Sequence, residues 1–380
     1  MPPLLDFTPP VFSFLRNAGL KARLTPCPDQ EINPIHSFTL DPHLGNSSPS
    51  CPPTQAPYNP CSNPTPSSPP QSTPANSKAK SSVPLSPTPA NATPKHHPQP
   101  LQTSTIVTGA SVGLGRHIAK AYAAAGSSVA CVARREPDLK SLVEEIKEAG
   151  GHAIAIVADV AERGAPKRIV DRTEAELGPV DVLCNNAAIS RIGPITLEDE
   201  DMDIWWRVHE VNVRAPVALI RAVLPSMMER KTGIVITISS GVASMALPVM
   251  TAYASSKAAI SKFHELLTIE LKGTGILSFS ATPGLVQTEL GKPEDALNKA
   301  AMDHPLLKAF MGSVGGMKHQ QPEVLADVLV AMSADERFKA LDGKFVSADR
   351  DVEPVLKEVE KEGGGRVVKE NMYTITIPQL

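Results

Sequence analysis

The sequence lacks the features that mark several classes of protein. It has few cysteines, five in 380 residues, and they form neither a CxxC pair nor a Cys/His spacing typical of zinc, so we predict no metal site. An odd number of cysteines also argues against a disulfide framework and favours a reducing compartment. The net charge of −3 gives no indication of a nucleic-acid partner. Because there is no run of about eighteen apolar residues, we predict no membrane span.

Proline is scarce outside the first hundred residues. Residues 1–100 contain 24 of the 37 prolines, together with many serine, threonine and asparagine residues. Such a segment buries too little apolar surface to offset the loss of chain entropy, so we predict a disordered N-terminal extension over 1–100. Cysteine usage favours a cytoplasmic location, while Arg16, Lys21 and Arg23 leave organelle targeting open.

After residue 100, strand-like and helix-like patterns alternate. This alternation predicts an α/β fold, a Rossmann-like doubly wound parallel sheet of about seven strands with helices on both faces. We place this domain at 101–350 and a C-terminal tail at 351–380. Strands are expected at Thr105–Thr108, Ser128–Ala133, His152–Ala158, Val180–Asn185, Ile234–Ser239, Ile276–Ala281 and Lys344–Ser347, and helices at Arg116–Ala125, Asp138–Ala149 and Tyr253–Lys272.

A glycine-rich turn follows the first expected strand. The stretch Thr108–Gly115 reads Thr-Gly-Ala-Ser-Val-Gly-Leu-Gly and leads into a helix-like segment. Glycines let the backbone approach a phosphate group closely, and a helix N-terminus favours negative charge. The turn therefore predicts a dinucleotide site.

The end of the second strand indicates which dinucleotide binds. An acid there would hydrogen-bond the ribose hydroxyl of NAD, whereas a basic residue accommodates the additional phosphate of NADP. This chain has Ala133-Arg134-Arg135 and no acid at that point. Since the Arg134 guanidinium suits a phosphate, we predict a preference for NADP(H) over NAD; the alternative is a pair of solvated loop arginines.

Three polar residues suit the interconversion of an alcohol and a carbonyl. Tyr253 and Lys257 stand four residues apart and so share a helix face, and Ser240 lies thirteen residues before the tyrosine. A phenol is a poor acid or base at neutral pH, but a nearby ammonium favours its ionised form. A serine hydroxyl can hydrogen-bond the oxygen that gains or loses the proton.

Taken in series, these motifs resemble the short-chain dehydrogenase/reductase family in its compact single-domain branch. The resemblance extends over about residues 102–350, with Ala188 standing where family members often carry glycine. The matching motifs are the glycine turn, Asp159-Val160, Asn185-Asn186-Ala187-Ala188, Val211-Asn212-Val213, Ser239-Ser240, the Tyr253/Lys257 pair, and Pro283-Gly284 with Thr288.

The resemblance implies roles for individual residues. Tyr253 would be the general acid in reduction and the base in oxidation, Lys257 would lower its pKa and bind the nicotinamide ribose, and Ser240 would polarise the substrate carbonyl. Asn212 would support a water-linked proton path to Lys257. The implied cofactor contacts are Thr108, Gly109, Ser111, Gly113, Leu114, Gly115, Arg134, Asp159, Val160, Asn185, Ala187, Tyr253, Lys257, Pro283, Gly284, Val286 and Thr288.

Less specific patterns concern the substrate and the assembly. A mobile lid is expected at Leu290–Gln321, which is long and of mixed polarity. The helix that starts at Tyr253 has more apolar surface than one sheet contact needs, and family members pair this helix, so a homodimer or homotetramer is expected. The expected walls of the substrate site are Ser190, Arg191, Ile192, Met245, Leu247 and Met250.

Two alternative functions stay open at this point. The sugar-nucleotide epimerase/dehydratase branch shares the Tyr-Lys pair, but its glycine spacing differs and this chain has no large C-terminal substrate domain. A nucleotide-sensing interaction protein with the same fold would use the Pro-rich extension to recruit partners. The presence of Asn212, Ser240, Tyr253 and Lys257 together favours an enzyme acting on a small-molecule carbonyl or alcohol.

Overall fold

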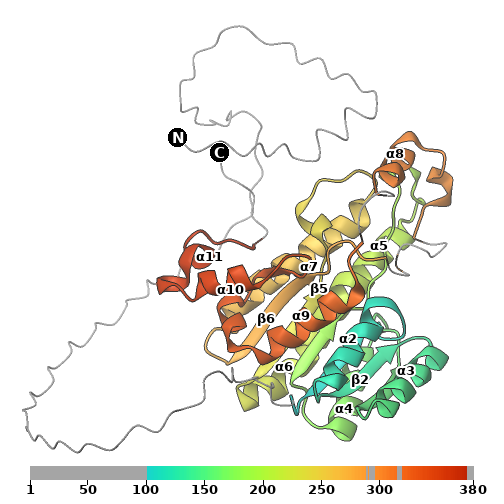
Figure 1. Cartoon of the computed structure of the whole chain (residues 1–380). Helices are drawn as coiled ribbons and strands as arrows, with labels where there is room; N and C mark the ends of the chain where they lie inside the picture. The colour runs from blue at the N-terminus through green and yellow to red at the C-terminus, as the bar shows by residue number, and fades with distance from the viewer. Residues whose placement is uncertain (1–100, 288–289, 291–295, 315–318, 375–380) are drawn as a thin grey trace, which may run out of the picture. The chain divides into compact units, whose positions relative to one another are not determined.

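Seven parallel strands form one sheet in the computed structural model, which describes residues 101–287, 290, 296–314 and 319–374 (Figure 1). This confirms the doubly wound α/β fold expected from the alternating pattern. The prediction of disorder over 1–100 lies outside the described residues. The strands are β1 Ser104–Thr108, β2 Ser128–Ala133, β3 His152–Val157, β4 Val182–Asn185, β5 Gly233–Ile238, β6 Ile276–Thr282 and β7 Phe345–Ser347.

The strand order is β3-β2-β1-β4-β5-β6-β7, and every neighbouring pair is parallel. The chain therefore adds β2 and β3 on one side of β1, and then returns to add β4 to β7 on the other side. In a sheet of this kind the crevice lies at the carboxyl ends of the strands, where the winding direction changes. The ends of β1 and β4 thus locate the site.

Helices cover both faces of the sheet because successive strand residues point to opposite sides. Val107 packs against α2, α3 and α9, whereas Ile106 packs in the cluster formed with α4, α6 and α7. The helices are α2 Gly113–Ala124, α3 Glu136–Glu148, α4 Ala165–Leu177, α5 Asp203–His209, α6 Ala215–Arg230, α7 Thr251–Glu270, α8 Pro305–Val314, α9 Pro322–Ala334, α10 Glu353–Val359 and α11 Gly365–Lys369.

Several element bounds differ from those expected. Helix α2 begins at Gly113, three residues before Arg116, so the last glycines of the turn belong to its first turn. The expected lid over 290–321 contains α8 in its described part, and the rest of it lies outside the described residues.

One helical run, Asp203–Arg230, is long and apolar enough to cross a membrane by length and composition, with a mean hydropathy of 1.2. It comprises α5, a π-helical turn and α6. Such a run is weak evidence of a span, because the core helix of a water-soluble protein passes the same test. Here α6 buries Leu219, Ile220 and Val223 against the sheet. The absence of a membrane span stays a prediction.

Helix α7 presents apolar side chains to solvent. Leu266 is 52% exposed and Ile269 is 69% exposed on the surface of this helix. This is the kind of surface that the expected homo-oligomer would bury, although the oligomeric state itself stays a prediction.

Residues 351–374 pack on the domain and do not form a separate tail. Leu356 and Val359 of α10 and Val367 of α11 are buried in the same cluster as Phe338 and Leu341. The backbone N–H of Phe345 in β7 also donates to the carbonyl of Tyr373 (2.7 Å). The segment therefore covers the end of the sheet at β7, and the boundary expected at residue 350 is not a structural one.

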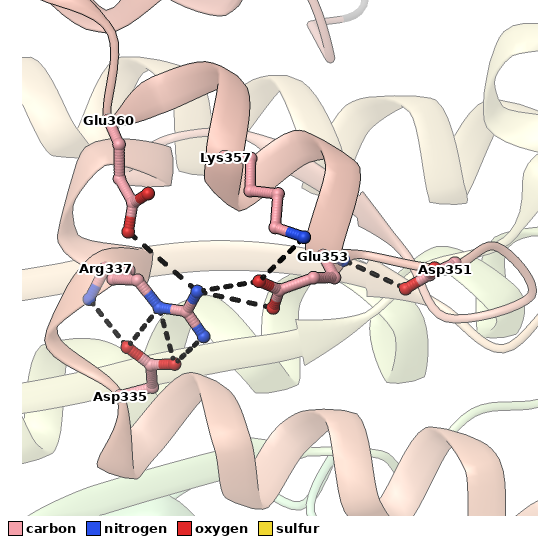
Figure 2. Close-up of polar contacts among 6 residues, drawn as sticks. All are labelled: Asp335, Arg337, Asp351, Glu353, Lys357 and Glu360. Atoms are coloured by element: carbon pink, nitrogen blue, oxygen red, sulfur yellow. Dashed lines mark hydrogen bonds and ion pairs between the residues drawn. The ribbon is translucent and has the colours of Figure 1, made fainter.

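A cluster of charged side chains fastens α10 to the end of α9 (Figure 2). The Arg337 guanidinium lies 2.7 Å from Asp335 Oδ2 and 3.1 Å from Glu353 Oε1, with Glu360 at 3.9 Å. Hydrogen bonds to Asp335 and Glu353 raise the pKa of Arg337 above its ordinary value. Arg337 thus bridges the residue that ends α9 and two acids of the C-terminal segment.

We expect Arg337→Ala to loosen the C-terminal segment, because it leaves several carboxylates without their shared cation. Limited proteolysis should then cut between residues 350 and 374 several-fold faster than in the wild type. Arg366→Ala is the matched control, since Arg366 pairs only with exposed Glu370 on α11 in the described ion pairs. Equal cleavage rates in the two variants would contradict the role given to Arg337.

Candidate active site

A large cavity lies along the carboxyl ends of the strands. Its volume is about 2870 Å³, more than the roughly 300–1,000 Å³ of a site for one small molecule. Residues from the ends of β1, β2, β4, β5 and β6 line it, together with α8 and the C-terminal segment. The cavity therefore has room for a dinucleotide and a second molecule.

The glycine turn has the backbone geometry of a phosphate cradle. Gly109 and Gly113 both have positive φ, +66° and +56°, which side chains with a Cβ rarely adopt. A Cβ on Gly115 would lie 2.2 Å from the carbonyl oxygen of Gly109, so only glycine fits there. Ser111, Gly113 and Leu114 line the cavity at the N-terminus of α2. These residues fit a pyrophosphate group.

Thr108 and Asn186 hold the turn against β4. The Thr108 hydroxyl accepts hydrogen bonds from the backbone N–H groups of Asn186 (3.0 Å) and Ala187 (3.1 Å). In return, the Asn186 amide donates to the carbonyls of Thr108 (2.9 Å) and Gly109 (3.3 Å). Thr108 and Gly115 do not line the cavity, so their part is to shape the turn.

Asn185 does not lie where it was expected. Its side chain is buried, its amide is 3.5 Å from the Thr237 hydroxyl, and it does not line the cavity. Strand β4 ends at Asn185, and the two residues that follow it, Asn186 and Ala187, line the cavity instead. Asn186 is a site residue that the motif contained but that we did not select.

The two arginines after β2 have different surroundings. Arg134 lines the cavity, is exposed and has no ion-pair partner among the described residues. The Arg135 guanidinium already has two partners. Its Nε forms an ion pair with Asp138 (3.0 Å), and its Nη2 donates to the Ser111 hydroxyl (3.5 Å). Arg134 is therefore a guanidinium at the cavity edge that is available to an anionic ligand.

Asp159 and Val160 line the cavity after β3. The Asp159 carboxylate accepts a hydrogen bond from the backbone N–H of Ala161 (2.9 Å) and pairs with Arg207 (2.7 Å). Asp159 thus fixes its own loop and ties it to α5, leaving Val160 as the apolar surface beside a ligand.

The loop after β6 forms a further part of the wall. Pro283, Gly284 and Val286 line the cavity. A Cβ on Gly284 would lie 2.5 Å from the Cβ of Asp349, so glycine lets the segment after β7 approach closely. Thr288 lies outside the described residues.

Tyr253 and Lys257 lie together in the first turns of α7, as their spacing indicated. Both side chains are buried and line the cavity, and the lysine Nζ is 5.6 Å from the centre of the tyrosine ring. The ammonium donates to the carbonyl of Ile238 at the end of β5 (2.7 Å). Burial lowers the pKa of Lys257 to about 7.

Ser240 lies at the same wall and lines the cavity. Burial raises the pKa of Tyr253 to about 12, and a hydrogen bond with Ser240 opposes this shift. Ser239 is different, since its hydroxyl contacts the Lys257 carbonyl (3.2 Å) and the Ser261 hydroxyl (2.7 Å) inside the core. Both serines line the cavity, so the choice of Ser240 over Ser239 stays a prediction.

Asn212 lies in a π-helical turn, Glu210–Arg214, between α5 and α6. Its side chain exchanges two hydrogen bonds with the backbone of Ile189 (2.9 and 3.0 Å) and donates to Ser256 of α7 (3.0 Å). Asn212 therefore joins the loop after β4 to the helix that carries Tyr253, without lining the cavity itself. Such π turns are frequent at functional sites, but nothing in the local sequence indicated one.

Of the expected substrate walls, Arg191 does not face the cavity. It is buried in an ion pair with Glu198 (2.8 Å), whereas Ser190, Ile192, Met245, Leu247 and Met250 line the cavity. Helix α8, which lies within the segment expected to form a lid, also lines the cavity, and so does Tyr373, which sequence reasoning missed. No metal-binding group of His, Cys, Asp or Glu occurs in the part of the chain that the structure describes.

Comparisons with known proteins agree with this geometry. The family model for short chain dehydrogenases matches residues 103–298. A short chain dehydrogenase from Pseudocercospora fijiensis is 55% identical over 290 residues, which cover 76% of this chain and 94% of the relative. The 2,3-dihydro-2,3-dihydroxybenzoate dehydrogenase of Bacillus subtilis is 36% identical over 186 residues, covering 49% of this chain and 70% of the relative.

Among solved structures, a candidate NAD(P)-dependent gluconate 5-dehydrogenase from Beutenbergia cavernae superposes with a TM-score of 0.56 and 28% sequence identity. The match covers 65% of this chain and 94% of that chain, whose crystal structure contains NADP at low occupancy.

Proposed function

We propose that the chain, which belongs to the short-chain dehydrogenase family, transfers hydride between NADP(H) and a carbonyl or secondary-alcohol substrate. The observation that carries the proposal is the meeting of Ser240, Tyr253 and Lys257 at one wall of a cavity that the glycine turn also lines. When bound, the nicotinamide supplies or accepts the hydride.

In this proposal Tyr253 donates the proton when a carbonyl is reduced. Its pKa of about 12 keeps the phenol protonated at neutral pH, so the proton is available to the substrate oxygen. Ser240 hydrogen-bonds the same phenol and orients the substrate oxygen toward it. Lys257 places positive charge beside the ring, which favours the phenolate formed after donation. The proton that reduction requires is therefore present on Tyr253 at neutral pH.

NADP(H) is proposed in preference to NAD because Arg134 offers an exposed guanidinium at the end of β2. Arg135 is held by Asp138, so Arg134 is the better placed of the two to meet a ribose phosphate. The neighbour from Beutenbergia cavernae, which holds NADP, supports this reading.

We expect Arg134→Asp to weaken NADPH binding by about 10- to 100-fold, because a charge-assisted contact becomes a repulsion. NADH affinity should stay the same or improve, since the new carboxylate can accept a hydrogen bond from a ribose hydroxyl. Titration of nicotinamide fluorescence measures both. Arg221→Asp, on the exposed face of α6, is the charge-matched control. Equal loss of NADPH affinity in the control would contradict the assignment.

The direct test of the proposed function starts with the same titration on the wild-type chain. Binding of NADPH followed by carbonyl-dependent loss of its absorbance would support a reductase. Binding of NADPH without turnover of any aldehyde or ketone in a broad panel would count against it, and binding of neither nucleotide would refute it.

The assembly and location are proposals too. A homodimer or homotetramer would bury Leu266 and Ile269 of α7, and sedimentation at micromolar concentration would show a monomer if this is wrong. A cytoplasmic location is in keeping with Cys131 and Cys184, which are buried free thiols.

A further inference from the structure

Tyr253 is embedded in apolar side chains. It belongs to a cluster of buried residues that also contains Val249, Met250, Leu307 and Phe310. Ile192, Leu247, Leu290 and Leu297 pack against this cluster. The catalytic hydroxyl of the proposed function therefore faces a space whose neighbouring surfaces are apolar.

Helix α8 places its apolar residues toward this space and keeps its charges away from it. Leu306, Ala309, Phe310 and Met311 line the cavity. Lys308 does not line it and pairs instead with Asp303 (2.9 Å). Leu306, Ala309 and Phe310 share one face because residues three and four apart lie together on a helix, and Met311 borders that face.

Three further segments beside Tyr253 bring no charge to this space, and the charged residues of the cavity lining, among them Arg207, Glu210 and Arg350, come from other segments. The segments 190–192, 242–250 and 296–313 contribute only uncharged residues to the cavity lining. Arg191, which could have met a carboxylate, is buried against Glu198 and turned from the cavity. The Ser190 hydroxyl donates to the carbonyl of Leu290 (3.0 Å), so it is already engaged.

The loop that carries these walls is held in place by backbone contacts. Ile192 and Leu297 form a parallel bridge, in which the Ile192 N–H donates to the carbonyl of Ala296 (2.7 Å) and the Asn298 N–H donates to the carbonyl of Ile192 (2.9 Å). A Cβ on Gly193 would lie 2.6 Å from the Cβ of Asn298, so the two loops meet closely. Main-chain contacts therefore hold the two loops that carry this apolar lining in a defined arrangement.

We infer that the substrate carries its carbonyl or hydroxyl on an uncharged, largely apolar skeleton the size of one or more rings. An ionised carboxylate or phosphate seated against these segments would lose its water and meet no cation on them, which is unfavourable. An apolar ring system would gain from burial against Met250, Leu297 and Phe310. This inference rests on the proposed function, because it assigns the space beside Tyr253 to the substrate.

The test compares acetylnaphthalene with acetylnaphthoate, which share a ketone and a ring system and differ by one carboxylate. Binding of each ketone is measured with the NADPH complex of the Tyr253→Phe variant, so that the ketone is not reduced during the measurement. We expect acetylnaphthalene to bind at least about tenfold more tightly than the acid. Tighter or equal binding of the acid would overturn the inference, as would binding of neither compound.

A pair of substitutions then locates the bound ketone. Met311 lines the cavity and is 47% exposed, so Met311→Lys can be introduced without burying a charge in the core. We expect it to weaken acetylnaphthalene binding by about tenfold and to narrow the preference over acetylnaphthoate. Met302→Lys, at 52% exposure and outside the cavity lining, is the matched control. An unchanged preference in Met311→Lys would place the ketone elsewhere.

These experiments test the inferred substrate class and the proposed reaction independently. Failure of the wild-type chain to reduce any carbonyl would refute the proposed function, while the binding comparison would still report on the cavity. If the chain reduced acetylnaphthoate at least as fast as acetylnaphthalene, the proposed reductase activity would be supported. The inference of an uncharged, apolar substrate would then be wrong.

Discussion

Replacement of Tyr253 by phenylalanine is expected to lower turnover by about 10²- to 10⁴-fold, the range over which a positioned acid or base accelerates proton transfer. The phenol is the acidic group that the structure places at the cavity wall beside Ser240. NADPH affinity should change little, because the glycine turn and Arg134 hold the opposite end of the proposed cofactor site. The measurements are kcat for a reduced ketone and Kd for NADPH.

Tyr122→Phe supplies the matched control. Tyr122 is a fully buried tyrosine of α2 whose hydroxyl donates to the carbonyl of Leu329 (3.0 Å) and lies 2.7 Å from Ser333. Losing that hydroxyl should reduce the free energy of unfolding by about 1 kcal/mol and leave kcat unchanged. If Tyr253→Phe lowered kcat no more than Tyr122→Phe, the chemistry assigned to Tyr253 would be wrong.

The same variant separates an enzyme from a nucleotide-sensing protein. A sensor needs the bound nucleotide and its surroundings, which Tyr253→Phe leaves in place. Its biological readout should then survive a substitution that removes turnover. An enzyme should lose turnover and readout together, and that is the outcome we expect.

Local patterns were enough to predict most of the strands and to place Tyr253 and Lys257 together on one helix. The buried strands of a parallel sheet are short apolar runs, so β2 was expected with the bounds that it has. Tyr253 and Lys257 face the cavity together because the four-residue spacing on a helix leaves little choice. Both features depend only on neighbouring residues.

Other features depend on contacts between distant parts of the chain, which one sequence does not reveal. Asn185 and Asn186 are chemically identical neighbours, and only the direction of β4 decides which faces the cavity. Arg191 turns away because Glu198 offers a buried partner. Residues 353–369 read as a charged tail, since their few apolar side chains gain burial only against Phe338 and Leu341.

Substitution of Lys257 is the second change with a large expected effect. It should raise the stability of the fold and lower turnover. The side chain is buried, and burial lowers its pKa from 10.5 to about 7. Below about pH 7 the folded and unfolded states both carry the charged form, so the folded state bears the full unfavourable free energy of a buried cation. Between about pH 7 and 10.5 only the unfolded state binds this proton, so the contribution of Lys257 to stability rises with pH.

Lys257→Met should therefore increase the free energy of unfolding by a few kcal/mol at pH values below about 7, since a pKa shift of one unit corresponds to about 1.4 kcal/mol. The gain should shrink steadily as the pH rises toward 10.5. Denaturant unfolding at about pH 6 and about pH 10 measures this difference. Lys262→Met is the control on the same helix, because its exposed ammonium pairs with Glu265 (2.6 Å) and its substitution should shift stability little at either pH.

Turnover should move in the opposite direction, falling by about 10²-fold or more, because the phenolate of Tyr253 loses the positive charge beside it. If Lys257 served only in packing, Lys257→Met would be no more stable than the wild type and would be equally active. A lysine kept for chemistry gives a variant that is more stable and inactive, since its buried charge is unfavourable for folding and useful only when Tyr253 gives up its proton. If Lys257→Met destabilised the fold at about pH 6, the lowered pKa would be wrong; if it kept full turnover, the support it gives to Tyr253 would be wrong.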